Sequence, residues 1–138
     1  MKNQQSLPDA EMTEKIIVAF IRKALPQARQ LGAAQRKELV NILRSELAAE
    51  GFRVYEPTRT NMYHRSRKIG QYQIDLVVDR RYAIAVKRVK GIPHKDIQRL
   101  EGALRQMRLP IGFVFNFGYS RKIIHRVDVD LSERRTTI

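Results

Sequence analysis

The chain has 138 residues, no cysteine, and 27 lysine and arginine residues against 14 acidic ones, which gives a formal net charge of +13 and a pI near 10.6. This length suits one domain, and the lack of cysteine excludes disulfides and thiolate metal sites. The sequence has neither an apolar run long enough to span a membrane nor the apolar stretch of a secretory signal, so we expect a cytoplasmic protein without membrane contact.

Two helices are predicted in the first third of the chain. Apolar residues at helical spacing predict a first helix that begins near Ala10, and Pro26 ends it or lies just past its end. A second helix is predicted from Ala33 to Glu50, where Gly51 follows as the terminating residue.

A β-hairpin is predicted in the middle of the chain. The segment YQIDLVV, residues 72–78, alternates in polarity and predicts one continuous strand. Its residues Tyr72, Ile74, Leu76 and Val78 are predicted to share one face. The segment YAIAVKRV, residues 82–89, is predicted to return antiparallel to it. This pairing sets Asp75 opposite Ala85 and places Lys87 on the same strand face as Ala85.

Other elements surround this hairpin. The polar and basic segment RTNMYHRSRKIG, residues 59–70, is predicted to be strand and loop. A helix is predicted over residues 94–107, and the apolar segment IGFVFNFG, residues 111–118, predicts a strand inside a covered sheet. Residues 122–129 are the last predicted strand.

These elements are expected to form a single domain over residues 9–130, between a flexible N-terminus at 1–8 and a C-terminal tail at 131–138. Their order is two helices, three strands, one helix and two strands. Such an order indicates an α/β or α+β fold, with a mixed β-sheet flanked by helices.

The segments IDLVVDRRYAIAVKRVK and HKDIQRLEGALRQMRLPIGFVFNFG resemble the PD-(D/E)XK nuclease superfamily, and within it small proteins with a GxxExxxR helix motif. Those proteins have an aspartate on one strand, Glu-x-Lys on the next, a glutamine on a helix and an apolar strand that ends in Asn-Phe-Gly. The matching positions here are Asp75, Lys87, Gln98 and 116–118, and the resemblance covers residues 44–127. It implies a restriction endonuclease-like core.

The resemblance also implies a phosphodiester hydrolase that depends on Mg²⁺ or Mn²⁺. Carboxylates hold such an ion, which stabilises charge and lowers the pKa of a bound water. The catalytic residues would be Asp75, Lys87 and Gln98, with Asp75 as a metal ligand. Ala85 stands where the family has glutamate, and an alanine has no oxygen to give a metal.

Several residues could compensate for Ala85. The position of the family's helix glutamate falls near Arg36, and Glu38, Glu46 or Glu101 could supply a displaced ligand. We expect a nuclease-like fold whose metal site has degenerated, and the alternative is an active endonuclease with a relocated acid. An engineered exchange of glutamate for alanine would leave the same sequence.

Simpler interpretations exist for each of these residues. Asp75 and Lys87 could form only a cross-strand ion pair, worth about 0.2–1 kcal/mol. Gln98 could face solvent, and Asn116 could merely end a strand.

The predicted partner is DNA or RNA, bound mainly through electrostatic contacts. Two further possibilities are a homodimer and, as a different function, an interaction subunit for an acidic protein. The cations expected to contact nucleic acid are Arg65, Arg67, Lys68, Lys87, Arg88, Lys90, Lys95 and Arg99.

Overall fold

The computed structural model describes residues 10–31, 36–57, 60–64, 66–118 and 122–132. The predicted N-terminal segment and most of the predicted tail therefore lie outside the described residues. In chain order the described residues form α1 (Ala10–Leu31), α2 (Arg36–Ala49), β1 (Val54–Tyr55), β2 (Thr60–His64), β3 (Arg67–Tyr72), β4 (Leu76–Val78), β5 (Tyr82–Lys87), α3 (His94–Met107), β6 (Ile111–Asn116) and β7 (Ile124–Asp128).

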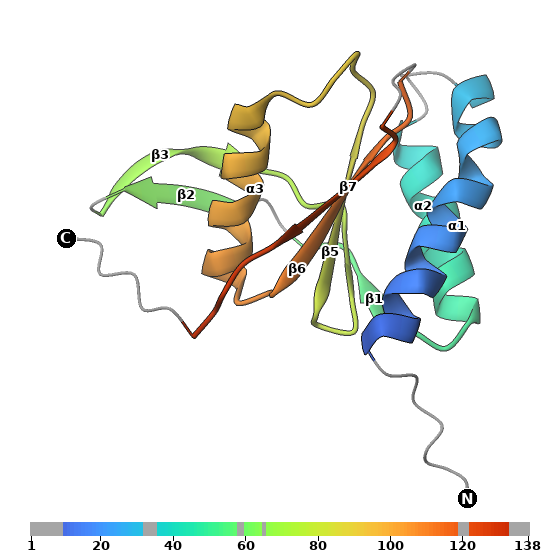
Figure 1. Ribbon diagram of the computed structural model, residues 1–138, viewed down its shortest axis with the longest axis horizontal. Coiled ribbons are helices and arrows are strands. Elements are labelled where there is room, and N and C mark those ends of the chain that lie inside the picture. Colours follow the sequence, from blue (N-terminus) through green and yellow to red (C-terminus); the bar gives the residue numbers. More distant parts are fainter. Residues whose placement is uncertain (1–9, 32–35, 58–59, 65, 119–121, 133–138) are drawn as a thin grey trace, which may run out of the picture.

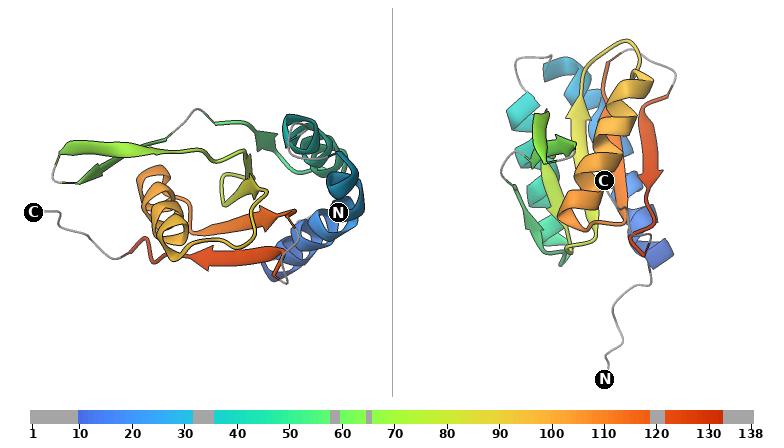
Figure 2. Two further views of the ribbon diagram at one scale, coloured as in Figure 1. Left: turned by 90° about the horizontal axis from the view of Figure 1, so that it is seen from above. Right: turned by 90° about the vertical axis from the view of Figure 1, so that its left-hand side faces the viewer.

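A mixed sheet of order β1-β4-β5-β6-β7 is the middle layer of the fold (Figure 1). β5 and β6 run parallel, and the other neighbours are antiparallel. α1 and α2 cover one face and α3 covers the other, as the two views of Figure 2 also show. The predicted mixed sheet flanked by helices is thus confirmed.

Alternate side chains of β5 point to opposite faces of the sheet. Tyr82, Ile84 and Val86 pack in the apolar cluster beneath α1 and α2. Ala83 and Ala85 pack in the second cluster, beneath α3. This alternation follows from the two-residue period of a strand, and it places every side chain between residues 82 and 86 in a covered layer.

The first helix is longer than predicted. α1 continues to Leu31, and Pro26 lies inside it with an exposed side chain. Proline removes one backbone N–H and disfavours a helix interior. The prediction that Pro26 ends the helix was wrong.

The other two helices agree closely with the sequence pattern. α2 ends at Ala49, and Gly51 follows with a φ of 101°, the left-handed conformation that suits glycine. α3 has the predicted bounds, and it crosses over between the parallel strands β5 and β6. The predicted start of the second helix at Ala33 lies outside the described residues.

The predicted strand over residues 72–78 is interrupted. β3 ends at Tyr72 and pairs with β2 in a separate two-stranded sheet, whereas β4 begins at Leu76 and joins the main sheet. Tyr72 and Ile74 therefore pack on the α3 side, while Leu76 and Val78 pack on the opposite side. The prediction of one face was wrong because residues 73–75 are not part of a strand, so the alternation does not continue from β3 into β4.

β2 and β3 form a hairpin that extends beside α3 (Figures 1 and 2). Its register shifts between Met62 and Tyr63, which indicates a bulge. The segment predicted as strand and loop is therefore mostly strand.

Among the described residues, no helix combines the length and the apolar character needed to cross a membrane.

Candidate functional site

Asp75 lies where the chain separates from β5. Its backbone N–H donates to the carbonyl of Ile84 at 2.9 Å, and Leu76 is paired with Ile84. The predicted position of Asp75 across from Ala85 is thus confirmed. The residue is 5% exposed, so its carboxyl group is enclosed by protein.

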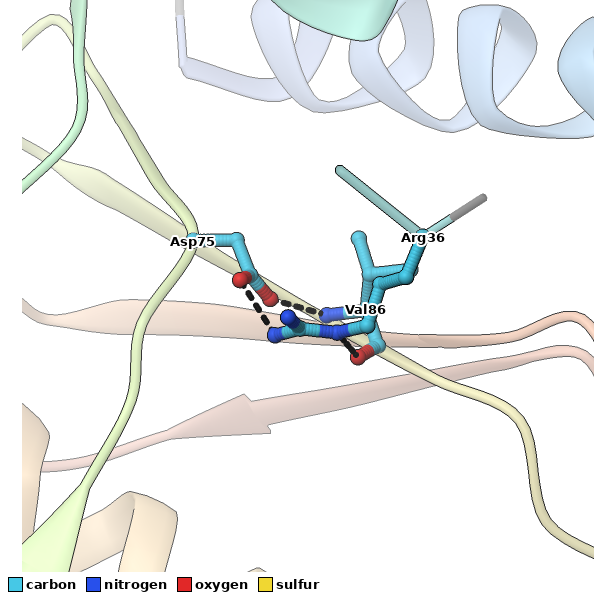
Figure 3. Close-up of polar contacts among 3 residues, drawn as sticks. All are labelled: Arg36, Asp75 and Val86. Carbon is cyan, nitrogen blue, oxygen red and sulfur yellow. Dashed lines mark hydrogen bonds and ion pairs between the residues drawn. The ribbon is translucent and has the colours of Figure 1, made fainter. Parts of the chain in front are cut away.

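Arg36, Asp75 and Val86 form a hydrogen-bonded group that we call the fork (Figure 3). The backbone N–H of Val86 donates to Oδ2 of Asp75 at 2.6 Å, and Nη2 of Arg36 donates to Oδ1. Nε of Arg36 donates to the carbonyl of Val86 at 2.9 Å. Arg36, the first residue of α2, thus binds the carbonyl of Val86 in β5, and Asp75 binds its N–H.

Burial raises the pKa of Asp75, because the charged form loses its hydration. Three neighbours oppose this effect: the N–H of Val86, the guanidinium of Arg36 and the ammonium of Lys87. Arg36 is thus the ion-pair partner of Asp75, whereas Lys87 acts on the carboxylate only at longer range. The interpretation of Asp75 and Lys87 as a direct ion pair is not what the structure shows.

Lys87 is held over an aromatic ring. Its Nζ lies 5.0 Å from the centre of the Tyr72 ring, within the range of a cation–π interaction. The hydroxyl of Tyr72 is buried and has no hydrogen-bond partner among the described residues. Burial and the nearby acids Asp96 and Asp75 raise the pKa of Tyr72, so its ring stays neutral beneath the ammonium.

The other residues of the predicted catalytic set lie in different surroundings. Ala85 is fully buried in the apolar cluster under α3. Gln98 is exposed on α3 and forms no hydrogen bond with Asp75 or Lys87. Within the described chain, then, Asp75 and Lys87 come together, and Gln98 does not join them through a polar contact.

Asn116 joins the ends of the two parallel strands. Its Oδ1 accepts hydrogen bonds from the N–H groups of Val89 and Gly118, at 3.1 and 3.0 Å. A Cβ atom on Gly118 would lie 2.3 Å from the carbonyl oxygen of Val89. The Asn-Phe-Gly sequence therefore lets the chain after β5 pass close to the end of β6.

Several predicted nucleic-acid contacts are exposed near this end of the sheet. Arg88, Val89 and Lys90, which follow β5, line a hollow of about 480 Å³ together with Gly118. Arg65 and the side chain of Lys68 lie outside the described part of the chain. The exposed cations of the predicted set are Arg67, Arg88, Lys90, Lys95 and Arg99.

Comparison with known protein families identifies this arrangement. A sequence model of the PD-(D/E)XK nuclease superfamily matches residues 10–127, which is most of the chain. The chain belongs to the PD-(D/E)XK nuclease superfamily. Its mixed sheet, with helices on both faces, agrees with the restriction endonuclease-like fold that the sequence predicted. Neither a curated protein nor a solved structure matches the chain significantly.

Nucleases of this superfamily are expected to hold a divalent metal ion, but the residues of the fork do not fit one. Both oxygens of Asp75 accept a hydrogen bond, and one donor is the guanidinium of Arg36, whose positive charge opposes a metal ion at the same carboxylate. Ala85 offers no ligand atom, and a carboxylate there would enter an apolar cluster. Among the described residues, no three His, Cys, Asp or Glu side chains form a group that could hold a metal.

The acids considered as displaced ligands do not complete such a group with Asp75. Glu46 is exposed and lines a separate small cavity of about 70 Å³ between α1 and α2. It follows Arg36 by ten positions, so it lies about 15 Å further along the helix axis. Glu38 is exposed in the first turn of α2, and Glu101 is half-buried on α3.

Sequence reasoning missed the roles of Arg36 and Tyr72. The alignment with the helix motif placed Arg36 near the family glutamate, but it gave no reason to pair this cation with Asp75. Tyr72 was predicted to lie on one face with Leu76. The interruption of the strand, which brings the ring of Tyr72 under Lys87, has no clear signal in the alternating pattern.

Proposed function

We propose that this protein binds nucleic acid through a nuclease fold that does not hydrolyse it. The observation that carries the proposal is the fork, in which Arg36 and the N–H of Val86 occupy the carboxylate of Asp75. Each carboxylate oxygen keeps a second lone pair, but the positive charge of Arg36 beside it repels a metal ion, which normally also needs further oxygen ligands. The chain has an alanine where that acid is expected, so it keeps the fold and lacks the ligands.

The charge of the chain supports nucleic acid as the ligand. The net charge of +13 favours a polyanion. The exposed cations Arg88 and Lys90 follow β5, and Lys95 and Arg99 lie on the adjoining helix α3. A backbone of phosphates could contact these side chains without sequence readout, so DNA and RNA are both candidate ligands.

The proposal is tested by titrating fluorescent DNA and RNA with the protein over a range of salt concentrations. About five phosphate contacts would give a slope near −4.5 for the logarithm of affinity against that of salt. Exchange of Arg88 and Lys90 for alanine should weaken binding to every sequence and reduce the slope by about 2.

Arg53→Ala is a suitable control, because this exposed residue lies beside the β4–β5 turn at the opposite end of the sheet. It should leave the slope near that of the wild type. Affinity that is independent of salt would overturn the proposal. No binding at low salt would instead favour an acidic protein as partner.

A second candidate is an active endonuclease that uses a relocated acid. The proximity of Lys87 and Asp75 favours it, because a lysine beside a carboxylate can orient a water molecule. Cleavage of labelled nucleic acid in Mg²⁺ or Mn²⁺, lost in both Asp75→Ala and Lys87→Ala, would establish this function.

A further inference from the structure

Arg36 has hydrogen-bond donors that the fork does not use. A guanidinium carries five N–H donors. Here Nε binds the carbonyl of Val86 and Nη2 binds Asp75, while no partner for Nη1 is found among the described residues. The side chain keeps 36% of its surface exposed, against 3% for that of Asp75. The guanidinium is therefore fixed by Nε and Nη2, on a side chain that is partly accessible to solvent.

The charges around the fork favour an anion. Arg36 balances the carboxylate of Asp75, and Lys87 lies close enough to act on the same carboxylate. Asp96 acts on Tyr72, the ring beneath Lys87, so these two cations and two acids balance. The positive excess comes from the exposed Arg88 and Lys90, which follow Lys87 in the chain. A phosphodiester carries one negative charge, and the planar donors of a guanidinium match phosphate oxygens well.

We infer that Arg36 is a fixed cation that binds a backbone phosphate of nucleic acid beside Asp75. The inference rests on the proposed function, since it names the residue that holds the phosphate. A divalent ion would neutralise phosphate charge and also activate water. Arg36 neutralises phosphate charge but does not activate water, because a guanidinium does not coordinate a water molecule as a metal does. Asp75 and Val86 are positioning residues, because their hydrogen bonds orient the guanidinium of Arg36.

The experiment compares two double variants that both leave the net charge unchanged. Arg36→Ala/Asp75→Ala removes the fork pair and leaves no buried charge without a partner. Arg44→Ala/Glu56→Ala removes an exposed pair whose Nη1 and Oε2 atoms are 3.3 Å apart. Fluorescence anisotropy with labelled DNA and RNA then gives the affinity and its salt slope for each protein.

We expect the fork variant to bind about tenfold more weakly and its salt slope to be smaller by about 1, because one phosphate contact is lost. The control pair should change neither quantity. Since bulk charge is the same in both variants, a difference between them reports on a contact at the fork.

Two single variants keep the inference testable if the double variant fails to fold. Arg36→Gln retains donors but loses the charge, so it should show the same loss of affinity and slope. Arg36→Lys retains the charge and should preserve the slope. Thermal unfolding establishes that each protein is folded.

Two results would overturn the inference. If the wild type binds in a salt-dependent way and loss of Arg36 changes neither affinity nor slope, Arg36 is not a phosphate contact, although the proposed function stands. If the wild type binds no nucleic acid at low salt, the proposed function and this inference fail together.

Discussion

Asp75 is a buried acid whose charged form is stabilised by a backbone N–H and by an arginine. Its side chain is almost fully enclosed, and its ionised form is stabilised by Arg36 and by the N–H of Val86. Removal of one partner from such a pair leaves a charge without compensation, which usually costs more than the pair contributes. At the scale of single residues, Arg36 therefore joins the N–H of Val86 in stabilising the ionised form of Asp75 inside the fold.

Arg36→Ala should lower the free energy of unfolding by about 1–3 kcal/mol at neutral pH, less than for a fully buried pair because Arg36 is partly exposed. Arg36 lowers the pKa of Asp75, so its loss raises the folded-state pKa further above the unfolded value. As pH falls through that folded-state pKa, Asp75 becomes protonated and the penalty shrinks. Urea denaturation of both proteins at several pH values measures this difference. A penalty that grows in acid would contradict the account.

At the scale of elements, the strands β5 and β6 and the helix between them follow directly from the sequence. Apolar segments bounded by turn residues identify both strands, and α3 has a helical period and the predicted bounds. The region around Asp75 could not be predicted in this way. There a buried carboxylate binds β5 through its side chain, and a strand ends within a segment that still alternates in polarity.

Only part of the candidate site could be predicted, because only some of its contacts are local in the sequence. Asp75 opposite Ala85 follows from hairpin register, which is local. The contact of Arg36 with Asp75 joins residues 39 positions apart and depends on how α2 packs against the sheet. Packing of this kind has no signature in the sequence around either residue.

The Asn-Phe-Gly turn gives a prediction at this scale. Gly118→Ala should destabilise the protein by about 1–3 kcal/mol, because its Cβ would meet the backbone of Val89 at 2.3 Å. Gly91→Ala is the matched control, since no atom lies within 4 Å of a Cβ there. Thermal unfolding measures both. Equal melting temperatures for the two variants would show that the chain after β5 does not pass so close to β6.

At the scale of the whole molecule, our proposal is that the nuclease fold is kept without its hydrolytic chemistry. The three layers of a PD-(D/E)XK nuclease are present, and the carboxyl ends of β5 and β6 still meet at one edge of the sheet. The net charge of +13 suits a nucleic-acid ligand. The acidic groups that would hold a metal are missing from the described residues, and an arginine is paired with the remaining aspartate.

The most direct test is to incubate the protein with labelled DNA and RNA in the presence of Mn²⁺, and to follow the bound and the cleaved fractions in the same samples. We predict a bound fraction that falls as salt is added, with the nucleic acid intact throughout. Cleavage that the wild type performs and Asp75→Ala does not would contradict the account, because it would show that Asp75 serves a working metal site.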